Sequence, residues 1–318
     1  MAAGFLACAA PDLDFVLSYA GPVVYLEQHR GVTHSVLLLP LWALLLSWVL
    51  AKLLREPRGW RALYGVTALA LAAHIAGDLI TGFGTVIFAP ISDWRAAIGT
   101  TFIIDLWFSG IILAGLLLSL MFRRTRLPAV AAGALLAGYV GFQYVQREKA
   151  IDFGQEYASS QNIKNANVSV HPRPATPFNW TVFVSDAESH RFAHVNLVRR
   201  EPRRVRPGDG FIARINSPYL PLDQAVWVTR TRYGHPPADD LARQAWNSPA
   251  LGFFRWFADL PAFDGTTEGS TCVWFNDLRF LTPGRDAMPF RFGACRDGPG
   301  SAWRAYQRGD SATRIPLP

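Results

Sequence analysis

The sequence lacks the motifs with which many soluble proteins bind nucleotides or nucleic acids. It contains no glycine-rich phosphate loop, no zinc-finger spacing of cysteine and histidine, and no basic helix with interleaved aromatic residues. It has no internal repeat and no low-complexity tract, and its first residues lack the basic segment of a signal peptide. A net charge of +7 would by itself favour a nucleic-acid partner, but without these motifs we expect none.

Cysteine is also scarce, with three residues in the chain. Cys8 lies in the apolar start, whereas Cys272 and Cys295 lie in the second half. An oxidising compartment would permit a disulfide between the latter two, and sequence spacing alone leaves this open against two free thiols.

Long apolar segments, in contrast, are abundant in the first half of the chain. Residues 33–53, 62–80 and 102–122 each approach the roughly 20 residues needed to span a bilayer, and residues 127–145 form a fourth segment richer in Gly and Ala. Residues 2–10 are apolar but too short to span alone. We therefore predict an α-helical membrane bundle of about four transmembrane helices after a short N-terminal half-helix.

Basic residues predict the orientation of these helices. They gather between the first and second full segments, at Lys52, Arg55, Arg58 and Arg61, and between the third and fourth, at Arg123, Arg124 and Arg126. Loops rich in Lys and Arg face the cytoplasm. We therefore expect a multi-pass protein of the bacterial inner membrane, embedded in the lipid bilayer, whose chain after the fourth span lies in the periplasm.

The chain changes character after residue 147. It becomes rich in Pro, Arg and Trp, with short apolar runs typical of strands. These runs are residues 180–184, 191–198, 211–215, 225–232, 272–280 and 290–294, and residues 241–246 indicate a short helix. We predict two domains, a transmembrane helical domain at 1–147 and a mostly β extracytoplasmic domain at 148–318.

Seven candidate ligands, all His or Asp, lie inside or at the rims of the apolar segments, and all fall on the predicted outer side: Asp12, Asp14, His29, His34, His74, Asp78 and Asp105. Charged groups at membrane depth are costly and usually mark function. Imidazoles and carboxylates are also the ligands of hydrolytic metal sites. Because chance would scatter these residues over both faces, we predict one site for a divalent metal, Zn²⁺ being favoured, with the first six residues as its ligands.

Each of these groups also has a structural explanation. His74 and Asp78 are one helical turn apart and share a face, but such a pair also joins two helices by a hydrogen bond. The histidines at 29 and 34 also suit an interfacial loop. Asp12 and Asp14 would point the same way on an extended segment, but two acids in a solvated turn are common.

Three further roles are predicted around the metal. Asp14 or Asp105 would act as the general base, and Asp105 would alternatively fix the tautomer of a histidine ligand. Arg30 and Arg95 would bind an anionic substrate group such as phosphate, or else contact lipid headgroups.

The order of these motifs resembles a known family, the membrane-bound metal-dependent hydrolases of the LexA-regulated inner-membrane type. The matching blocks are Pro11-Asp-Leu-Asp14, His29-Arg-Gly-Val-Thr-His34-Ser35, His74-Ile-Ala-Gly-Asp78, Thr81-Gly-Phe-Gly-Thr85, Pro90-Ile-Ser-Asp-Trp-Arg95 and Phe102-Ile-Ile-Asp105. Residues 255–259 and 277–280 resemble the outer domain of one branch. The resemblance implies metal-dependent hydrolysis, and in that family a further apolar helix usually precedes the segment at Met1 and could carry another ligand. More distantly, the His-x-x-x-Asp pair resembles zinc phospholipase C and P1 nuclease.

Three functions compete at this stage. The first is a hydrolase at the outer face of the inner membrane that acts on a lipid or lipid-linked phosphoester. The second is an anchored envelope scaffold whose β domain binds partners without catalysis. The third, a proton- or metal-coupled transporter, is disfavoured because the cytoplasmic halves of the spans carry almost no polar residues. The sequence leaves the oligomeric state open.

Overall fold

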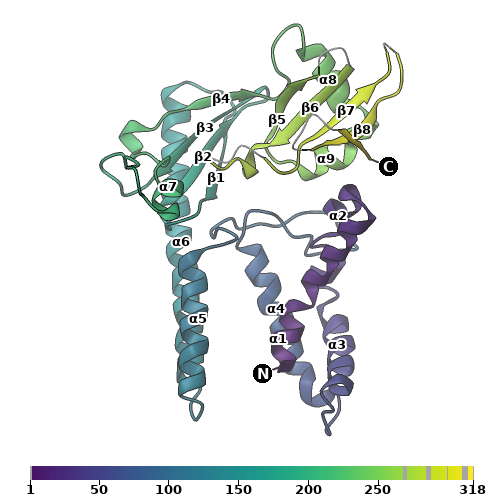
Figure 1. The fold of residues 1–318 in the computed structure, drawn as a ribbon, viewed down its shortest axis with the longest axis vertical. Helices are drawn as coiled ribbons and strands as arrows, with labels where there is room; N and C mark the ends of the chain where they lie inside the picture. Colours follow the sequence, from purple (N-terminus) through teal and green to yellow (C-terminus); the bar gives the residue numbers. More distant parts are fainter. Residues whose placement is uncertain (1, 268–270, 284–287, 299, 310–313, 318) are drawn as a thin grey trace. The chain divides into compact units, whose positions relative to one another are not determined.

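The computed structural model describes residues 2–267, 271–283, 288–298, 300–309 and 314–317. The chain divides into two compact units, Met1–Gly99 and Thr100–Pro318 (Figure 1). The first unit is helical. The second contains a helical hairpin followed by two antiparallel sheets. The predicted fold class, membrane helices followed by a β-rich domain, is confirmed.

The first unit is built from short and long apolar helices. In chain order these are α1 (Ala2–Ala9), the 3-10 helix η1 (Pro11–Ala20), α2 (Pro22–Gln28), the 3-10 helix η2 (Val32–His34), α3 (Leu39–Leu53) and α4 (Arg61–Leu79). Small residues allow α1 to approach α4 closely, since Ala3 and Ala7 are buried and a Cβ at Gly4 would lie 3.3 Å from Val66. Ala2–Ala20 and α4 are each long and apolar enough to cross a bilayer.

The predicted span at residues 33–53 is broken in the structure. Residues Pro22–His34 and Leu39–Leu53 meet at an angle of 82°, so they form either one broken span or a re-entrant loop. His34 was expected in the first turn of a continuous helix, but it ends η2 instead. Because of this bend, His34 does not lie on a continuation of the α3 axis.

The second unit begins with a hairpin of two apolar helices, α5 (Leu106–Met121) and α6 (Leu127–Ser160). They pack closely because Gly115 faces Ala132, where an added Cβ would lie 2.4 Å from the alanine Cβ. α6 is one continuous helix of 34 residues that passes the predicted domain boundary and packs against the first sheet. The boundary at residue 147 stays a prediction.

The first sheet has the strand order β1-β2-β3-β4, from β1 (Asn167–Pro172), β2 (Asn179–Ser185), β3 (Ser189–Asn196) and β4 (Val228–Thr231). Alternate side chains point to opposite faces. One face, with Trp180 and Val182, packs on Ala150 of α6, and the other, with Phe183 and Phe192, packs against the core of the second sheet.

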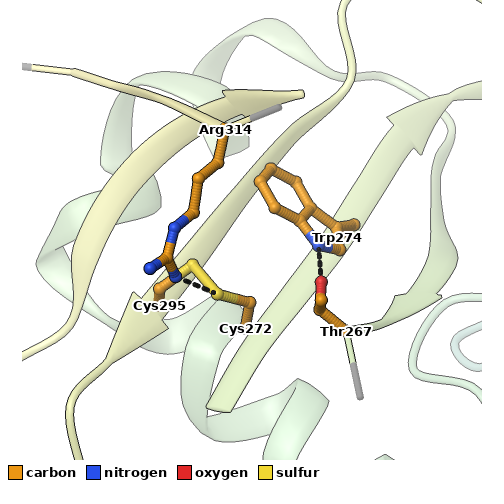
Figure 2. Close-up of a disulfide and its surroundings, with 5 residues drawn as sticks. All are labelled: Thr267, Cys272, Trp274, Cys295 and Arg314. Carbon is orange, nitrogen blue, oxygen red and sulfur yellow. Dashed lines mark hydrogen bonds between the residues drawn. A yellow bond between two sulfur atoms is a disulfide. The ribbon is translucent and has the colours of Figure 1, made fainter. Parts of the chain in front are cut away.

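The second sheet has the order β5-β6-β7-β8-β9, from β5 (Pro261–Thr266), β6 (Thr271–Asp277), β7 (Phe292–Arg296), β8 (Arg304–Arg308) and β9 (Arg314–Pro316). Cys272 and Cys295 are direct cross-strand neighbours, and a disulfide joins them (Figure 2). This resolves the pairing that sequence spacing left open. The remaining helices are α7 (Phe211–Asn216), η3 (Leu222–Gln224), α8 (Asp239–Asn247), η4 (Pro249–Leu251), α9 (Gly252–Phe257) and η5 (Leu278–Phe280).

One strand prediction was wrong. Residues 211–215 form helix α7, because among the described residues no strand pairs with this short apolar run, and hydrogen bonds from the Ser217 amide close its last turn. The Asn216 carbonyl accepts from Arg199 Nη1 at 3.1 Å, and Leu220 rather than α7 bridges to β3. A run of five residues does not distinguish helix from strand by periodicity.

Two histidines of β3 are held in the neutral state inside the β domain. His190 is 1% exposed, accepts from Ser185 Oγ and donates from Nε2 to the Pro261 carbonyl at 2.8 Å, so it links the two sheets. His194 lies beside Thr181 and the buried Arg173. Burial, and then the Arg173 charge, lower the pKa of His194 to about 3. Burial also lowers the pKa of His190.

These lowered pKa values predict acid sensitivity of the β domain. An unfolded histidine binds a proton near pH 6.5 while folded His194 stays neutral, so stability is complete above that pH and falls as pH decreases toward the folded pKa. Between pH 7.5 and 5, His194 alone should lower the free energy of unfolding by up to about 2 kcal/mol. Denaturant unfolding of the wild type and of His194→Gln at both pH values measures this. An equal pH dependence in both proteins would contradict the assignment.

Candidate metal centre

Three elements of the first unit bring four predicted ligands together. Asp12 lies in the first turn of η1, and His34 ends η2. His74 and Asp78 lie one turn apart near the end of α4, as their spacing predicts. One ligand atom from each residue lies within 4.8 Å of the other three.

The distances between these atoms are close to those of a tetrahedral metal site. His34 Nε2 is 3.1 Å from His74 Nε2, 2.9 Å from Asp78 Oδ2 and 3.5 Å from Asp12 Oδ1. His74 Nε2 is 3.4 Å from Asp12 Oδ1 and 3.5 Å from Asp78 Oδ2. Four ligands bound to Zn²⁺ at its usual distances in a regular tetrahedron lie about 3.3 Å apart. The residues therefore fit a single small divalent cation.

Burial supports the same conclusion. The His34 side chain is fully buried, and those of His74 and Asp78 are each 12% exposed. Asp78 Oδ2 is buried and, among the residues that the structure describes, has no hydrogen-bond donor in suitable geometry. Leaving a buried carboxylate oxygen unsatisfied is costly, and a cation would satisfy it. Asp12 is 57% exposed, so the cluster opens to its surroundings at this residue.

A chain of hydrogen bonds fixes the His34 imidazole. Thr33 Oγ1 donates to Asp14 Oδ2 at 2.9 Å, so its single proton is used there. The contact of 2.9 Å between Thr33 Oγ1 and His34 Nδ1 must then have Nδ1–H as the donor. His34 Nε2 is left with its lone pair directed at the cluster, which is the tautomer that a metal ligand requires.

Asp14 and His29 lie beside the four-residue cluster rather than within it. Asp14 Oδ1 accepts from His29 Nδ1 at 2.7 Å, and its Oδ2 also accepts from the Arg30 amide at 3.0 Å. The extended segment expected for Asp12 and Asp14 was wrong, because these residues belong to a 3-10 helix. With three residues per turn, side chains two positions apart point in different directions, which sends Asp12 to the cluster and Asp14 to His29 and Thr33.

Arg30 adds a positive charge at the edge of the cluster. Its Nη2 lies 2.9 Å from Asp78 Oδ1, and its Nη1 donates to Thr81 Oγ1 at 3.0 Å. The residue has a φ of 58°, a costly left-handed conformation. It is held there because its amide bonds Asp14 and its carbonyl accepts from the Val86 amide at 2.9 Å.

Arg95 lies in the loop after α4, whereas Arg30 lies between α2 and η2, and the two contact the same aromatic ring. Both guanidinium groups lie over the Phe83 ring, at 5.1 Å for Arg30 and 5.6 Å for Arg95. Arg95 also donates to the Phe83 carbonyl. Gly84 has a φ of 95°, and a Cβ there would lie 3.0 Å from Arg95 Nη2, so glycine is required. The substrate-binding role of both arginines stays a prediction.

Asp105 belongs to the second unit, where it caps α5. Its Oδ1 accepts from the amides of Trp107 and Phe108 at 2.9 and 2.8 Å. Both of its oxygens accept from Tyr139 Oη, which joins α5 to α6. A capping role therefore explains these contacts, and its role as a general base stays a prediction.

Sequence reasoning missed the roles of two threonines. The Thr33 hydroxyl connects Asp14 to His34. Thr81 donates to the Asp78 carbonyl at 2.7 Å and accepts from Arg30, which supports both residues. The sequence offered one signal for these roles: Thr33 directly precedes His34, and Thr81 follows Asp78 by three residues. This signal is weak because threonine is common at helix ends.

The helical part of the chain is similar to known proteins. Residues 1–150 match the family described as YdjM inner membrane protein. A stretch of 90 residues is 32% identical to "Uncharacterized protein YfhP" of Bacillus subtilis (strain 168) and covers 28% of this chain and 27% of that protein. No solved structure matches. The expected resemblance to a membrane-bound family is thereby confirmed: residues 1–150 of this membrane protein are similar to the YdjM inner membrane protein family.

Proposed function

We propose that Asp12, His34, His74 and Asp78 hold one divalent cation, with Zn²⁺ favoured, and that the site hydrolyses a phosphoester of a lipid or lipid-linked substrate. The observation that carries the proposal is the convergence of four donor atoms at near-tetrahedral spacing within a membrane unit. Two imidazoles and two carboxylates are a donor set typical of Zn²⁺. When bound, the cation would lower the pKa of a water molecule and polarise the phosphoester.

The chain's own residues have separable tasks in this reaction. Thr33 and Asp14 keep His34 in the tautomer that leaves Nε2 free. His29 and Asp14 form a dyad in which the carboxylate holds Nδ1–H, so His29 Nε2 is available to accept a proton from water and return it to the leaving group. The His29 ring centroid lies 6.3 Å from that of His34, so the dyad lies beside the four proposed ligands.

Substrate binding is proposed at the same edge. Arg30 carries its charge next to Asp78, and its buried Nε has no acceptor among the described residues. Guanidinium pairs well with phosphate, so the positive charge of Arg30 supports an anionic substrate group at this edge of the cluster. Lipid is the proposed substrate class because the cluster lies at the ends of apolar helices.

The outer face is proposed as the location of the site. The basic loops at residues 52–61 and 123–126 support a cytoplasmic position for the opposite helix ends. The Cys272–Cys295 disulfide supports an oxidising compartment, and hence the periplasm, for the β domain.

Metal binding should depend on the two α4 ligands. The full-length wild type should purify with one divalent ion per chain, and the His74→Ala/Asp78→Ala double variant should lose it, because two of four donors are removed. Elemental analysis measures the ion content. The matched control is His235→Ala/Asp240→Ala, an exposed pair in the β domain. Equal metal content in all three proteins would reject the site and favour an anchored scaffold.

The Thr33 hydroxyl should set metal affinity without binding the metal. Thr33→Val keeps the side-chain shape but frees His34 to adopt the wrong tautomer, so affinity should fall about 10- to 100-fold. Thr33→Ser should restore it. Competition with a chromogenic chelator gives the affinities. If Val and Ser at this position behave alike, the hydrogen-bond chain does not orient His34.

His29 should affect the rate rather than metal content. His29→Gln should lower kcat for a phospholipid or phosphodiester substrate by about 100- to 10,000-fold, because it removes the proton acceptor and keeps the four ligands. Assays of released phosphate or of the released lipid product, with elemental analysis of the same wild-type and variant preparations, test this. Loss of metal together with activity would instead make His29 a ligand, as the sequence first suggested.

A further inference from the structure

A surface segment of the β domain combines arginines with exposed apolar side chains. This segment, residues 198–214, is called here the arginine loop and includes the start of α7. It contains six arginines and only two acidic residues. Its side chains at Arg200, Arg203, Arg204, Arg206 and Arg214 are exposed. Arg203, Arg204 and Arg206 line an open surface pocket with a volume of about 690 Å³.

Apolar residues are interleaved with these charges and also face outward. Val198 is 56% exposed, Val205 50%, Phe211 70% and Ile212 47%. Single exposed apolar residues are ordinary, but four in one short basic segment are not. Arginine with interspersed Phe, Ile and Val is the composition of surfaces that bind the headgroup region of a membrane.

Contacts within the second unit place the arginine loop at the level where α6 leaves the bilayer. The apolar part of α6 ends before Arg147, and Phe142 packs against Phe178 with ring centroids 5.8 Å apart. The Phe178 carbonyl accepts from the Leu197 amide at 3.0 Å, and the arginine loop begins at the next residue.

The other end of the loop is held at the same place. Asn216, at the end of α7, accepts from Asn179 Nδ2 at 2.8 Å and from Arg199 Nη2 at 3.0 Å. Gly154, twelve residues farther along α6, faces Val182 instead, so β2 leads away from the membrane. Figure 1 shows α7 at the end of the first sheet nearest the α5–α6 hairpin.

We propose that the arginine loop docks onto anionic phospholipid headgroups of the leaflet from which α6 emerges. The arginines would pair with lipid phosphates, and Phe211, Ile212 and Val205 would enter the boundary between headgroups and acyl chains. Docking would fix the β domain against the bilayer. This assignment is independent of the metal centre and of the face on which the domain lies, because it depends only on the leaflet at the end of α6.

A fluorescent label tests the depth of the loop in the intact protein. Phe211→Cys in a Cys8→Ala background offers one free thiol, since Cys272 and Cys295 are joined. The control site is Ala187→Cys, exposed in the β2–β3 turn at the opposite end of the sheet, roughly 20 Å farther from the hairpin. Full-length proteins are compared in nanodiscs of pure phosphatidylcholine and in nanodiscs containing phosphatidylglycerol.

The label at residue 211 should be protected only where anionic lipid is present. Phosphatidylglycerol should lower its quenching by the neutral quencher acrylamide about twofold or more relative to phosphatidylcholine, whereas the label at 187 should not change. Protection equal in both lipids, or none in either, overturns the proposal. A label that responds to an added oligonucleotide or acidic peptide but not to phosphatidylglycerol also overturns it, because the partner is then another polyanion.

Charge reversal provides a second readout. Arg203→Glu/Arg204→Glu should abolish the protection by phosphatidylglycerol, and raised salt should weaken it in the wild type. The matched control, Arg230→Glu/Arg304→Glu, changes the same charge at exposed positions outside the loop and should keep the protection. Equal loss in both variants would show a nonspecific effect of net charge and overturn the assignment.

Discussion

The hydrogen bond between Thr33 and His34 is the interaction on which the candidate centre depends. His34 is fully buried, so its two ring nitrogens must both find partners inside the protein. Thr33, whose proton is taken by Asp14, receives Nδ1–H and leaves Nε2 facing His74, Asp12 and Asp78. With the other tautomer, Nε2–H would face His74 and Asp78 and would leave no lone pair for a cation. The tautomer that Thr33 favours leaves Nε2 free to act as a ligand of the proposed cation.

Charge is balanced around this site in two layers. Asp12 and Asp78 face the centre, and two carboxylates so close repel each other unless a cation lies between them. Asp14 lies one layer out and is compensated by His29 and the Arg30 amide. Arg30 pairs with the Asp78 oxygen that turns away from the centre, so each oxygen of Asp78 has a separate electrostatic task. This separation would allow Arg30 to lie beside the proposed cation without competing for the same carboxylate oxygen.

Sequence patterns predicted the part of the site that lies on regular structure. His74 and Asp78 converge because helical spacing alone places them on one face. The choice between Asp12 and Asp14 was beyond the pattern, because it depends on whether the segment is extended or a 3-10 helix. Local backbone conformation was also ambiguous at residues 211–215, which were expected to form a strand and instead form α7. Strands β2 and β3 were found because they contain short apolar runs, such as Val182-Phe183-Val184 in β2, whereas β1 and β8 carry too few apolar residues to give that signal.

The break before α3 is what allows His34 to reach α4, and the loop after α4 compensates for it. Backbone groups left unpaired at membrane depth are costly, so irregular chain persists there only when protein satisfies it. The Val36 amide donates to the Ile87 carbonyl at 2.9 Å, and Ser35 Oγ donates to the Ala89 carbonyl at 2.6 Å. The Arg30 carbonyl accepts from Val86 within the same loop. The loop thus replaces the bonds that a continuous helix would have made.

A continuous helix would carry His34 along the direction of α3, whereas the bend of 82° lets η2 present it to His74 and Asp78. The geometry of the candidate centre and the irregular backbone are therefore linked, because the loop that pairs these free backbone groups also holds η2 where it presents His34 to α4.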